Sequence, residues 1–178
     1  QVDDDQAVDA GGDGFGEEAA DAAGIDRIVV AHEDDRSLVV GRAEGADHGE
    51  GLVHGLAGVE GALIGMMDDP EWVQDMVTTY TNAIINHWEV LLAEEGLPDA
   101  IFYYDDMGFK GRPFMSPDMY HEVLKPGHVR LIDFAHSKGL PVILHSCGYI
   151  KPLLPDLIDA GIDCLQAIEY KAGMDIVE

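Results

Sequence analysis

Three short apolar segments in the second half of the chain alternate with longer amphipathic segments. The apolar segments span residues 100–104, 141–144 and 162–165, and they are apolar at nearly every position. Nearly continuous apolar strands separated by helical segments are typical of a parallel sheet that is covered by helices. The sequence therefore predicts an α/β fold.

The longest amphipathic segment predicts a helix that ends before Gly96. Pro70 fits its first turn, where the missing N–H costs no hydrogen bond, and either Asp68 or Asp69 can serve as the capping residue. Apolar residues then recur at steps of three and four positions, as they do on one face of a helix. This is the strongest helix signal in the chain.

Two further helices are expected between the apolar segments. A capping serine followed by proline at residues 116–117 opens a helix that runs to Gly139. The sequence Pro126-Gly127 should kink or split this helix, because proline removes a hydrogen bond from the helix interior. A shorter helix is predicted over residues 152–160, before the third apolar segment.

The amino-terminal part of the chain has a different composition. Residues 1–24 consist mostly of Asp, Glu, Gly and Ala and can bury little apolar surface, while the runs 25–31 and 37–41 predict a strand pair. Eight glycines fall within residues 41–65, an excess that predicts loops. We therefore expect residues 1–60 to form an acidic, irregular segment.

Charge and cysteine content exclude several classes of function. The chain of 178 residues carries 35 acidic and 10 basic side chains and a formal charge of −25, which disfavours nucleic-acid binding. No apolar run approaches the roughly 20 residues that a membrane helix requires. Two cysteines are too few for a disulfide framework and indicate a reducing compartment. We expect a cytoplasmic protein that binds a small molecule and neither membranes nor nucleic acids.

Polar residues follow the first two predicted strands at the point where each strand ends. Asp105 and Asp106 follow the first strand, and His145 and Cys147 follow the second. Loops converge at the carboxyl ends of parallel strands, so active sites lie there. His145 and Cys147 are two residues apart on an extended segment and share a face, where an imidazole and a thiolate can bind zinc together. The alternative is a buried cysteine beside a hydrogen-bonded histidine.

The two aspartates are the candidate catalytic residues. Asp105 or Asp106 could orient His145 through its free ring nitrogen, or could contact the substrate. The alternative is that one of them caps the loop and the other is solvated. Lys110 and Arg112, in the same loop, could contact an anionic substrate group or could be solvated loop charges.

Four motifs resemble the uroporphyrinogen decarboxylase (URO-D) superfamily. They are MSPDMY at residues 115–120, KPGH at 125–128, GLPVILHSCG at 139–148 and LIDAGID at 157–163. The resemblance implies a parallel (β/α)8 barrel of the TIM type. Since a complete barrel needs about 250 residues, we expect residues 61–178 to form an incomplete or truncated one.

The His-x-Cys-Gly element resembles the cobalamin-dependent zinc methyltransferase branch of that superfamily. The resemblance implies that His145 and Cys147 bind zinc and that a later cysteine, at a position beyond Glu178, supplies a third ligand. Cys164 falls inside the third predicted strand and is not a good candidate. The implied function is zinc-dependent methyl transfer between a thiol and a corrinoid that a partner protein carries.

Two alternative functions stay open at this point. One is uroporphyrinogen decarboxylase activity in porphyrin and haem biosynthesis. The Arg-rich amino-terminal signature of that branch is absent from residues 1–60, and its catalytic strand-end residues are not recognisable at residues 104–107. The other is a non-catalytic barrel fragment that acts as a binding or scaffold domain. The oligomeric state also stays open, with a homodimer as one option.

Overall fold

The computed structural model describes residues 28–31, 39–41, 52–175 and 177. The predictions for residues 1–24 and for the loop at 42–51 lie outside these ranges. Of the predicted amino-terminal strand pair, two short strands fall within them and pair antiparallel.

A five-stranded sheet with the order β2-β1-β3-β6-β7 forms the centre of the described structure. Its strands are β1 (Ile28–Ala31), β2 (Val39–Gly41), β3 (Ala100–Tyr104), β6 (Val142–His145) and β7 (Cys164–Gln166). Four of them pair in parallel, and their order in the sheet follows their order in the chain. The predicted α/β class with a parallel sheet is confirmed. Within the described residues the sheet is open, with β2 and β7 at its edges.

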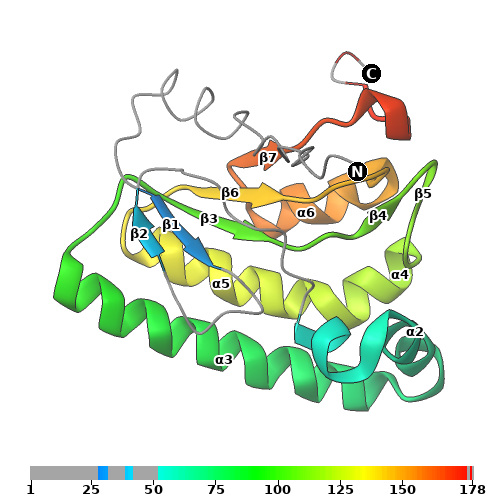
Figure 1. Cartoon of the computed structure of the whole chain (residues 1–178), viewed down its shortest axis with the longest axis horizontal. Coiled ribbons are helices and arrows are strands. Elements are labelled where there is room, and N and C mark those ends of the chain that lie inside the picture. The colour runs from blue at the N-terminus through cyan, green and yellow to red at the C-terminus, as the bar shows by residue number, and fades with distance from the viewer. Residues whose placement is uncertain (1–27, 32–38, 42–51, 176, 178) are drawn as a thin grey trace, which may run out of the picture.

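The helices α3 (Pro70–Glu95) and α5 (Lys125–Ser137) lie along one side of this sheet (Figure 1). Side chains of β3 alternate between the two faces, as in any strand. Ile101 and Tyr103 pack into the main core with residues of the helices, whereas Phe102 packs on the other face with Tyr104. The sheet therefore has a helix-covered face and a second face that carries aromatic side chains.

The long helix α3 begins where the sequence predicts. Asp69 is its capping residue, and the Asp69 carboxylate accepts a hydrogen bond from the Trp72 N–H at 3.2 Å. Pro70 occupies the first turn. Although α3 has 26 residues, neither it nor any other described helix combines the length and apolar character that crossing a bilayer requires.

A helix replaces much of the loop that the glycine content predicts. The prediction is wrong from residue 52 onward, because α2 spans Leu52–Asp68. Packing explains why glycine is accepted here: a Cβ atom on Gly65 would lie 2.8 Å from the ring of Trp72 on α3. Glycine lowers helix propensity by about 1 kcal/mol relative to alanine, and close packing of α2 on α3 offsets that cost.

The second predicted helix is split, as expected, but earlier than expected. Its parts are α4 (Pro117–Met119), a π-helical turn η1 (Tyr120–Leu124) and α5 (Lys125–Ser137). The Lys125 N–H donates to the carbonyl of Tyr120, five residues back. Pro126 has no N–H for the carbonyl of Glu122, which instead accepts a hydrogen bond from Gln74 Nε2 of α3 at 3.0 Å. The carbonyl that the proline leaves without a helical partner therefore forms a hydrogen bond between η1 and α3.

The remaining elements are short. They are β4 (Gly108–Phe109) and β5 (Arg112–Pro113), which form a hairpin, the 3-10 turns η2 (Lys151–Leu153) and η3 (Tyr170–Ala172), and α6 (Leu154–Ala160). The third strand begins at residue 164, two residues later than predicted. The Asp163 carboxylate just before it accepts hydrogen bonds from the Val142 N–H and from His136 Nε2, both at 2.8 Å.

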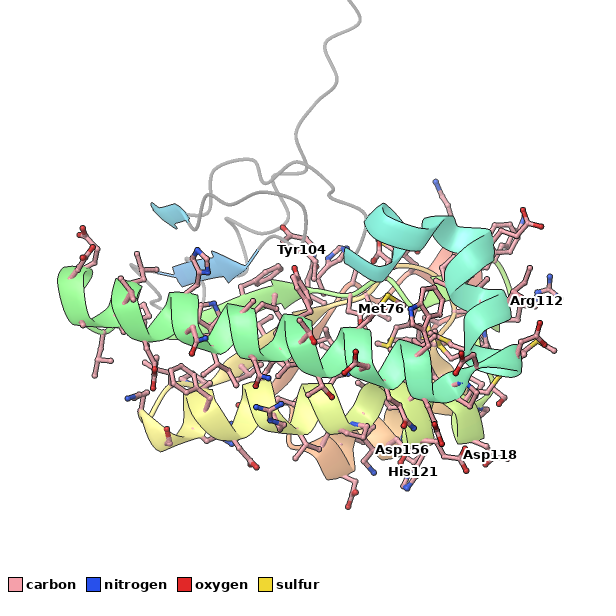
Figure 2. All side chains as sticks on the ribbon, turned by 90° about the horizontal axis from the view of Figure 1, so that it is seen from below. Met76, Tyr104, Arg112, Asp118, His121 and Asp156 are labelled. Carbon is pink, nitrogen blue, oxygen red and sulfur yellow. The ribbon has the colours of Figure 1, made fainter. Side chains whose placement is uncertain are left out.

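An ion-pair network joins α5 and η1 to α6. Lys125 Nζ lies 2.7 Å from both Asp156 Oδ1 and Asp159 Oδ2, and His121 Nδ1 lies 2.7 Å from Asp156 Oδ1. Figure 2 shows Asp156 and His121 side by side at the helix layer, away from Tyr104. Hydrogen bonds from Lys125 and His121 hold the pKa of the Asp156 carboxyl below its ordinary value.

Replacing Asp156 should change how stability responds to acid. Because the folded-state pKa of Asp156 is lowered from 3.8, its charge stabilises the fold above about pH 4, and this contribution is lost as the pH falls through the lowered value. We expect Asp156→Asn to be less stable than wild type at about pH 5, with the difference shrinking toward about pH 2.5. Urea unfolding across this range measures the difference.

Glu89→Gln is the matched control for this experiment. Glu89 is an exposed acid in the second half of α3 and has no ion pair among the residues that the structure describes. Its stability curve should run parallel to that of wild type. A difference between Asp156→Asn and wild type that stays constant from neutral to acidic pH would contradict the assigned role.

Candidate metal centre

The pairing of β3 with β6 brings the polar residues after the two strands to the same end of the sheet. Tyr104, the last residue of β3, lies opposite His145, the last residue of β6. Asp106 and Cys147 each follow two residues later in the chain. The carboxyl ends of the strands therefore carry the site, as the sequence predicts.

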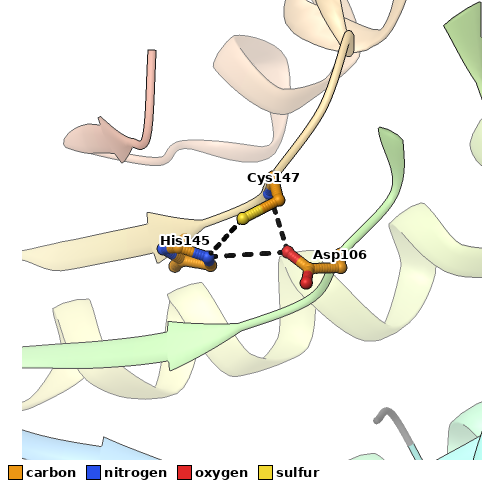
Figure 3. Close-up of side chains that lie close together, drawn as sticks. All are labelled: Asp106, His145 and Cys147. Atoms are coloured by element: carbon orange, nitrogen blue, oxygen red, sulfur yellow. Dashed lines mark hydrogen bonds and ion pairs between the residues drawn. The ribbon is translucent and has the colours of Figure 1, made fainter. Parts of the chain in front are cut away.

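Three donor atoms gather at this point (Figure 3). His145 Nε2 lies 3.1 Å from Cys147 Sγ and 3.6 Å from Asp106 Oδ1. The ligand atoms of the three side chains all lie within 4.8 Å of one another. His145 and Cys147 share a face, which is the geometry that their spacing predicts. Whether they bind metal stays a prediction.

The histidine of this cluster is buried and the aspartate is open to solvent. His145 is 5% exposed, and its ring packs beside Tyr104 at a centroid distance of 4.8 Å and beside Phe102 at 6.3 Å. The Asp106 side chain is 48% exposed. The cluster can therefore be reached from solvent on the Asp106 side while its imidazole stays fixed among aromatic rings.

Hydrogen bonds between the loops after β3 and β6 fix the donors in place. The Cys147 N–H donates to Asp106 Oδ1 at 2.7 Å, and the Met107 N–H donates to Oγ of the fully buried Ser146 at 3.0 Å. The Asp105 N–H donates to the His145 carbonyl at 3.0 Å. Each loop thus holds the other, so the three donor atoms are brought together by the fold itself.

Two glycines allow the same loops to touch backbone to backbone. A Cβ atom on Gly148 would lie 2.4 Å from the carbonyl carbon of Gly108, and one on Gly108 would lie 2.4 Å from the Cys147 carbonyl oxygen. Gly148 also has a φ of +81°, a conformation that disfavours any residue with a Cβ atom. The approach of the two loops requires glycine at both positions.

Asp105 points away from the three donors and toward the helices. Its Oδ2 accepts a hydrogen bond from His128 Nε2 at 2.7 Å, and His128 Nδ1 accepts one from the Tyr120 hydroxyl at 2.8 Å. Burial, with the nearby charges of Asp105 and Asp156, raises the pKa of Tyr120, so the hydroxyl remains a donor. Asp105 is therefore anchored to α5, and only Asp106 lies beside His145.

The group that contacts the second ring nitrogen of His145 is Gln166. Its side-chain oxygen Oε1 contacts His145 Nδ1, the position at which the sequence suggested an aspartate. Sequence reasoning missed Gln166 because it lies one residue beyond the predicted third strand. The sequence did contain one signal for Gln166: it directly follows the third predicted strand, at the carboxyl end where site residues are expected.

The other candidates from the sequence lie away from the cluster. Lys110 and Arg112 are exposed on the β4–β5 hairpin, and Figure 2 shows Arg112 projecting at the margin of the molecule. Cys164 is exposed at the start of β7, opposite Ile143. It therefore lies at the opposite end of the short strand β7 from Gln166.

The donor set suits zinc. Imidazole nitrogen, thiolate sulfur and carboxylate oxygen are all zinc ligands, and bonds of about 2.0–2.3 Å in a tetrahedral site place two donors about 3.3–3.8 Å apart. The distances of 3.1 Å and 3.6 Å from His145 Nε2 are close to this range. Three protein ligands with one open position are typical of catalytic zinc. Asp106 can thus occupy the third position, for which the family resemblance implies a later cysteine.

Comparisons with known proteins agree with the motifs. A family model described as uroporphyrinogen decarboxylase (URO-D) matches residues 51–175, a range that includes all three donors. A methylated-thiol--coenzyme M methyltransferase from Methanosarcina mazei is 29% identical over 109 residues, which amount to 61% of this chain and 28% of the relative. This chain therefore matches less than a third of that relative's length. No solved structure matches the chain.

Gly148→Ala should destabilise the protein more than Gly139→Ala. Both glycines have a positive φ, +81° and +75°, which costs a residue with a Cβ atom about 1–2 kcal/mol. Only Gly148 touches another backbone, whereas a Cβ atom on Gly139 would meet nothing within 4 Å. We expect an additional loss of about 1–3 kcal/mol for Gly148→Ala in urea unfolding. Equal losses would contradict the close contact of the two loops.

Proposed function

This chain belongs to the uroporphyrinogen decarboxylase (URO-D) family, and on that premise we propose that it catalyses zinc-dependent methyl transfer between a corrinoid carrier and a thiol. The observation that carries the proposal is the convergence of His145 Nε2, Cys147 Sγ and Asp106 Oδ1 at the carboxyl ends of two parallel strands. A thiolate donor beside an imidazole favours a borderline metal such as zinc over magnesium or calcium.

The topology supports an arc of a (β/α)8 barrel. In a barrel of this type each new strand is added next to the previous one, and the helices stay on the outer side. The strands β1, β3, β6 and β7 follow one another in this way, and α3 and α5 lie on one face (Figure 1). The cluster is on the opposite face, which would be the interior of such a barrel.

Each residue of the cluster has its own role in the proposed reaction. His145, Cys147 and Asp106 would hold the zinc ion, and zinc, when bound, favours the deprotonated and therefore nucleophilic form of a thiol. Burial of the imidazole and the hydrogen bond from the Cys147 N–H to Asp106 hold the donor atoms close together. The exposed side of Asp106 leaves a direction from which a thiol can approach.

The proposed reaction also needs a methyl donor. The thiol loses its proton, its sulfur forms a bond to the methyl carbon, and the electron pair of the cobalt–carbon bond stays with the corrinoid. A corrinoid carried by a partner protein is the donor that the methyltransferase branch implies. The name of the Methanosarcina mazei relative, which states transfer from a methylated thiol to coenzyme M, supports a small thiol as substrate.

Decarboxylation, the reaction in the family name, is the second candidate. A substrate with several carboxylates calls for arginine or lysine at the site, whereas the described cluster contributes an acid, Asp106. The bases that follow β3, Lys110 and Arg112, are exposed on the hairpin. Formation of coproporphyrinogen from uroporphyrinogen by the purified chain would decide for this alternative.

Zinc content gives the first test of the proposal. Purified protein should bind one zinc ion per chain, and Cys147→Ser should weaken binding by more than about 100-fold, since loss of an outer hydrogen-bond partner alone costs about 10- to 100-fold. Competition with a chromophoric chelator measures the affinity. Cys164→Ser is the matched control, because Cys164 is exposed at the far end of β7, and it should bind zinc like wild type.

Activity gives the second test. With methylcobalamin and 2-mercaptoethanol as probes, the zinc-loaded chain should demethylate the corrinoid, and Cys147→Ser should reduce the rate to the uncatalysed background. Zinc binding without methyl transfer would favour a scaffold role over catalysis. A wild-type protein that binds no zinc would contradict the proposal outright.

A further inference from the structure

Both ring nitrogens of His145 face groups that can accept a hydrogen bond from the ring. On one side Gln166 Oε1 contacts Nδ1, and on the other side Asp106 Oδ1 lies 3.6 Å from Nε2. A neutral imidazole carries one N–H, so one nitrogen donates and the other keeps its lone pair. The group that receives the proton therefore decides which nitrogen remains able to bind a metal.

We infer that Gln166 is a positioning residue that holds the proton of His145 on Nδ1 and so leaves the Nε2 lone pair directed at Cys147 and Asp106. This inference rests on the proposed zinc site for its purpose, although the tautomer itself can be measured without metal. Metal-binding histidines commonly donate their other ring N–H to an oxygen acceptor, which fixes both tautomer and orientation. Gln166 supplies that oxygen here.

Without the Gln166 side chain, the population of the Nε2–H tautomer of His145 would increase. An N–H on Nε2 could then donate toward the Asp106 carboxylate or the Cys147 sulfur, 3.1 Å away. That proton would occupy the nitrogen that faces the donor cluster. The rings of Tyr104 and Phe102 hold the imidazole plane, so the histidine would keep its place while losing a free lone pair at the metal-binding position.

The Gln166 side chain is not needed to hold the strand. Its backbone pairs β7 with β6 opposite His145, and its carbonyl accepts a hydrogen bond from the Ser146 N–H at 2.7 Å. Substitutions of the side chain keep both interactions. A role in orienting His145 can therefore be separated from a role in folding.

The test begins with metal-free protein labelled with ¹⁵N at histidine. Long-range ¹H–¹⁵N correlation spectra distinguish the two neutral tautomers, and His145→Gln identifies the signals of His145. We expect the Nδ1–H form in wild type, the same form in Gln166→Glu, whose carboxylate can only accept, and a shift toward Nε2–H in Gln166→Met. A wild-type Nε2–H tautomer would overturn the inference.

Zinc affinity then measures the consequence. Gln166→Met should bind zinc about 10- to 100-fold more weakly than wild type, and Gln166→Glu should restore binding. Gln74→Met is the matched control, because it removes a glutamine side-chain hydrogen bond on α3 outside the cluster, and its affinity should equal that of wild type. Unchanged affinity in Gln166→Met, or failure of rescue by Gln166→Glu, would contradict the inference. If wild type binds no zinc, the proposed function fails and the tautomer spectra still decide the role of Gln166.

Discussion

The parallel pairing of β3 with β6 is the constraint on which the candidate site depends. Its register places Tyr104 opposite His145, so the residues after each strand meet at one end of the sheet. A slip of one residue would turn every side chain of a strand to the other face, and His145 would then enter the helix-covered core. The hydrogen bonds between the two loops and the contact of Gly108 with Gly148 reinforce this register.

The two faces of the sheet carry different groups of interactions, one that stabilises the fold and one that forms the candidate site. On the helix side, Asp105 is anchored through His128 to Tyr120, and Lys125 ties the helices together through Asp156. On the other side, His145 lies among aromatic rings and faces Cys147. Asp105 and Asp106 are consecutive and therefore point to opposite sides, which is why one supports the fold and the other joins the donor cluster.

Much of this arrangement could be predicted from the sequence, because it depends on local patterns. The apolar segments, a helix start capped by Asp68 or Asp69, and the shared face of His145 and Cys147 follow from local sequence patterns and spacing. The helix at Leu52–Asp68 could not be predicted, because glycine disfavours helix locally and the close packing of Gly65 against Trp72 is a contact between two helices. Gln166 was missed because it lies just beyond the predicted third strand, and its contact with His145, 21 positions away in the chain, cannot be seen in a local pattern.

The proposed function requires that one histidine, one cysteine and one aspartate bind a single metal ion together. X-ray absorption spectroscopy at the zinc edge of the zinc-loaded protein tests this requirement, because it identifies the atoms bound to the metal. We expect one sulfur atom at about 2.3 Å from zinc and nitrogen or oxygen neighbours at about 2.0–2.2 Å. A zinc ion surrounded only by nitrogen and oxygen would place the metal elsewhere and contradict binding by Cys147.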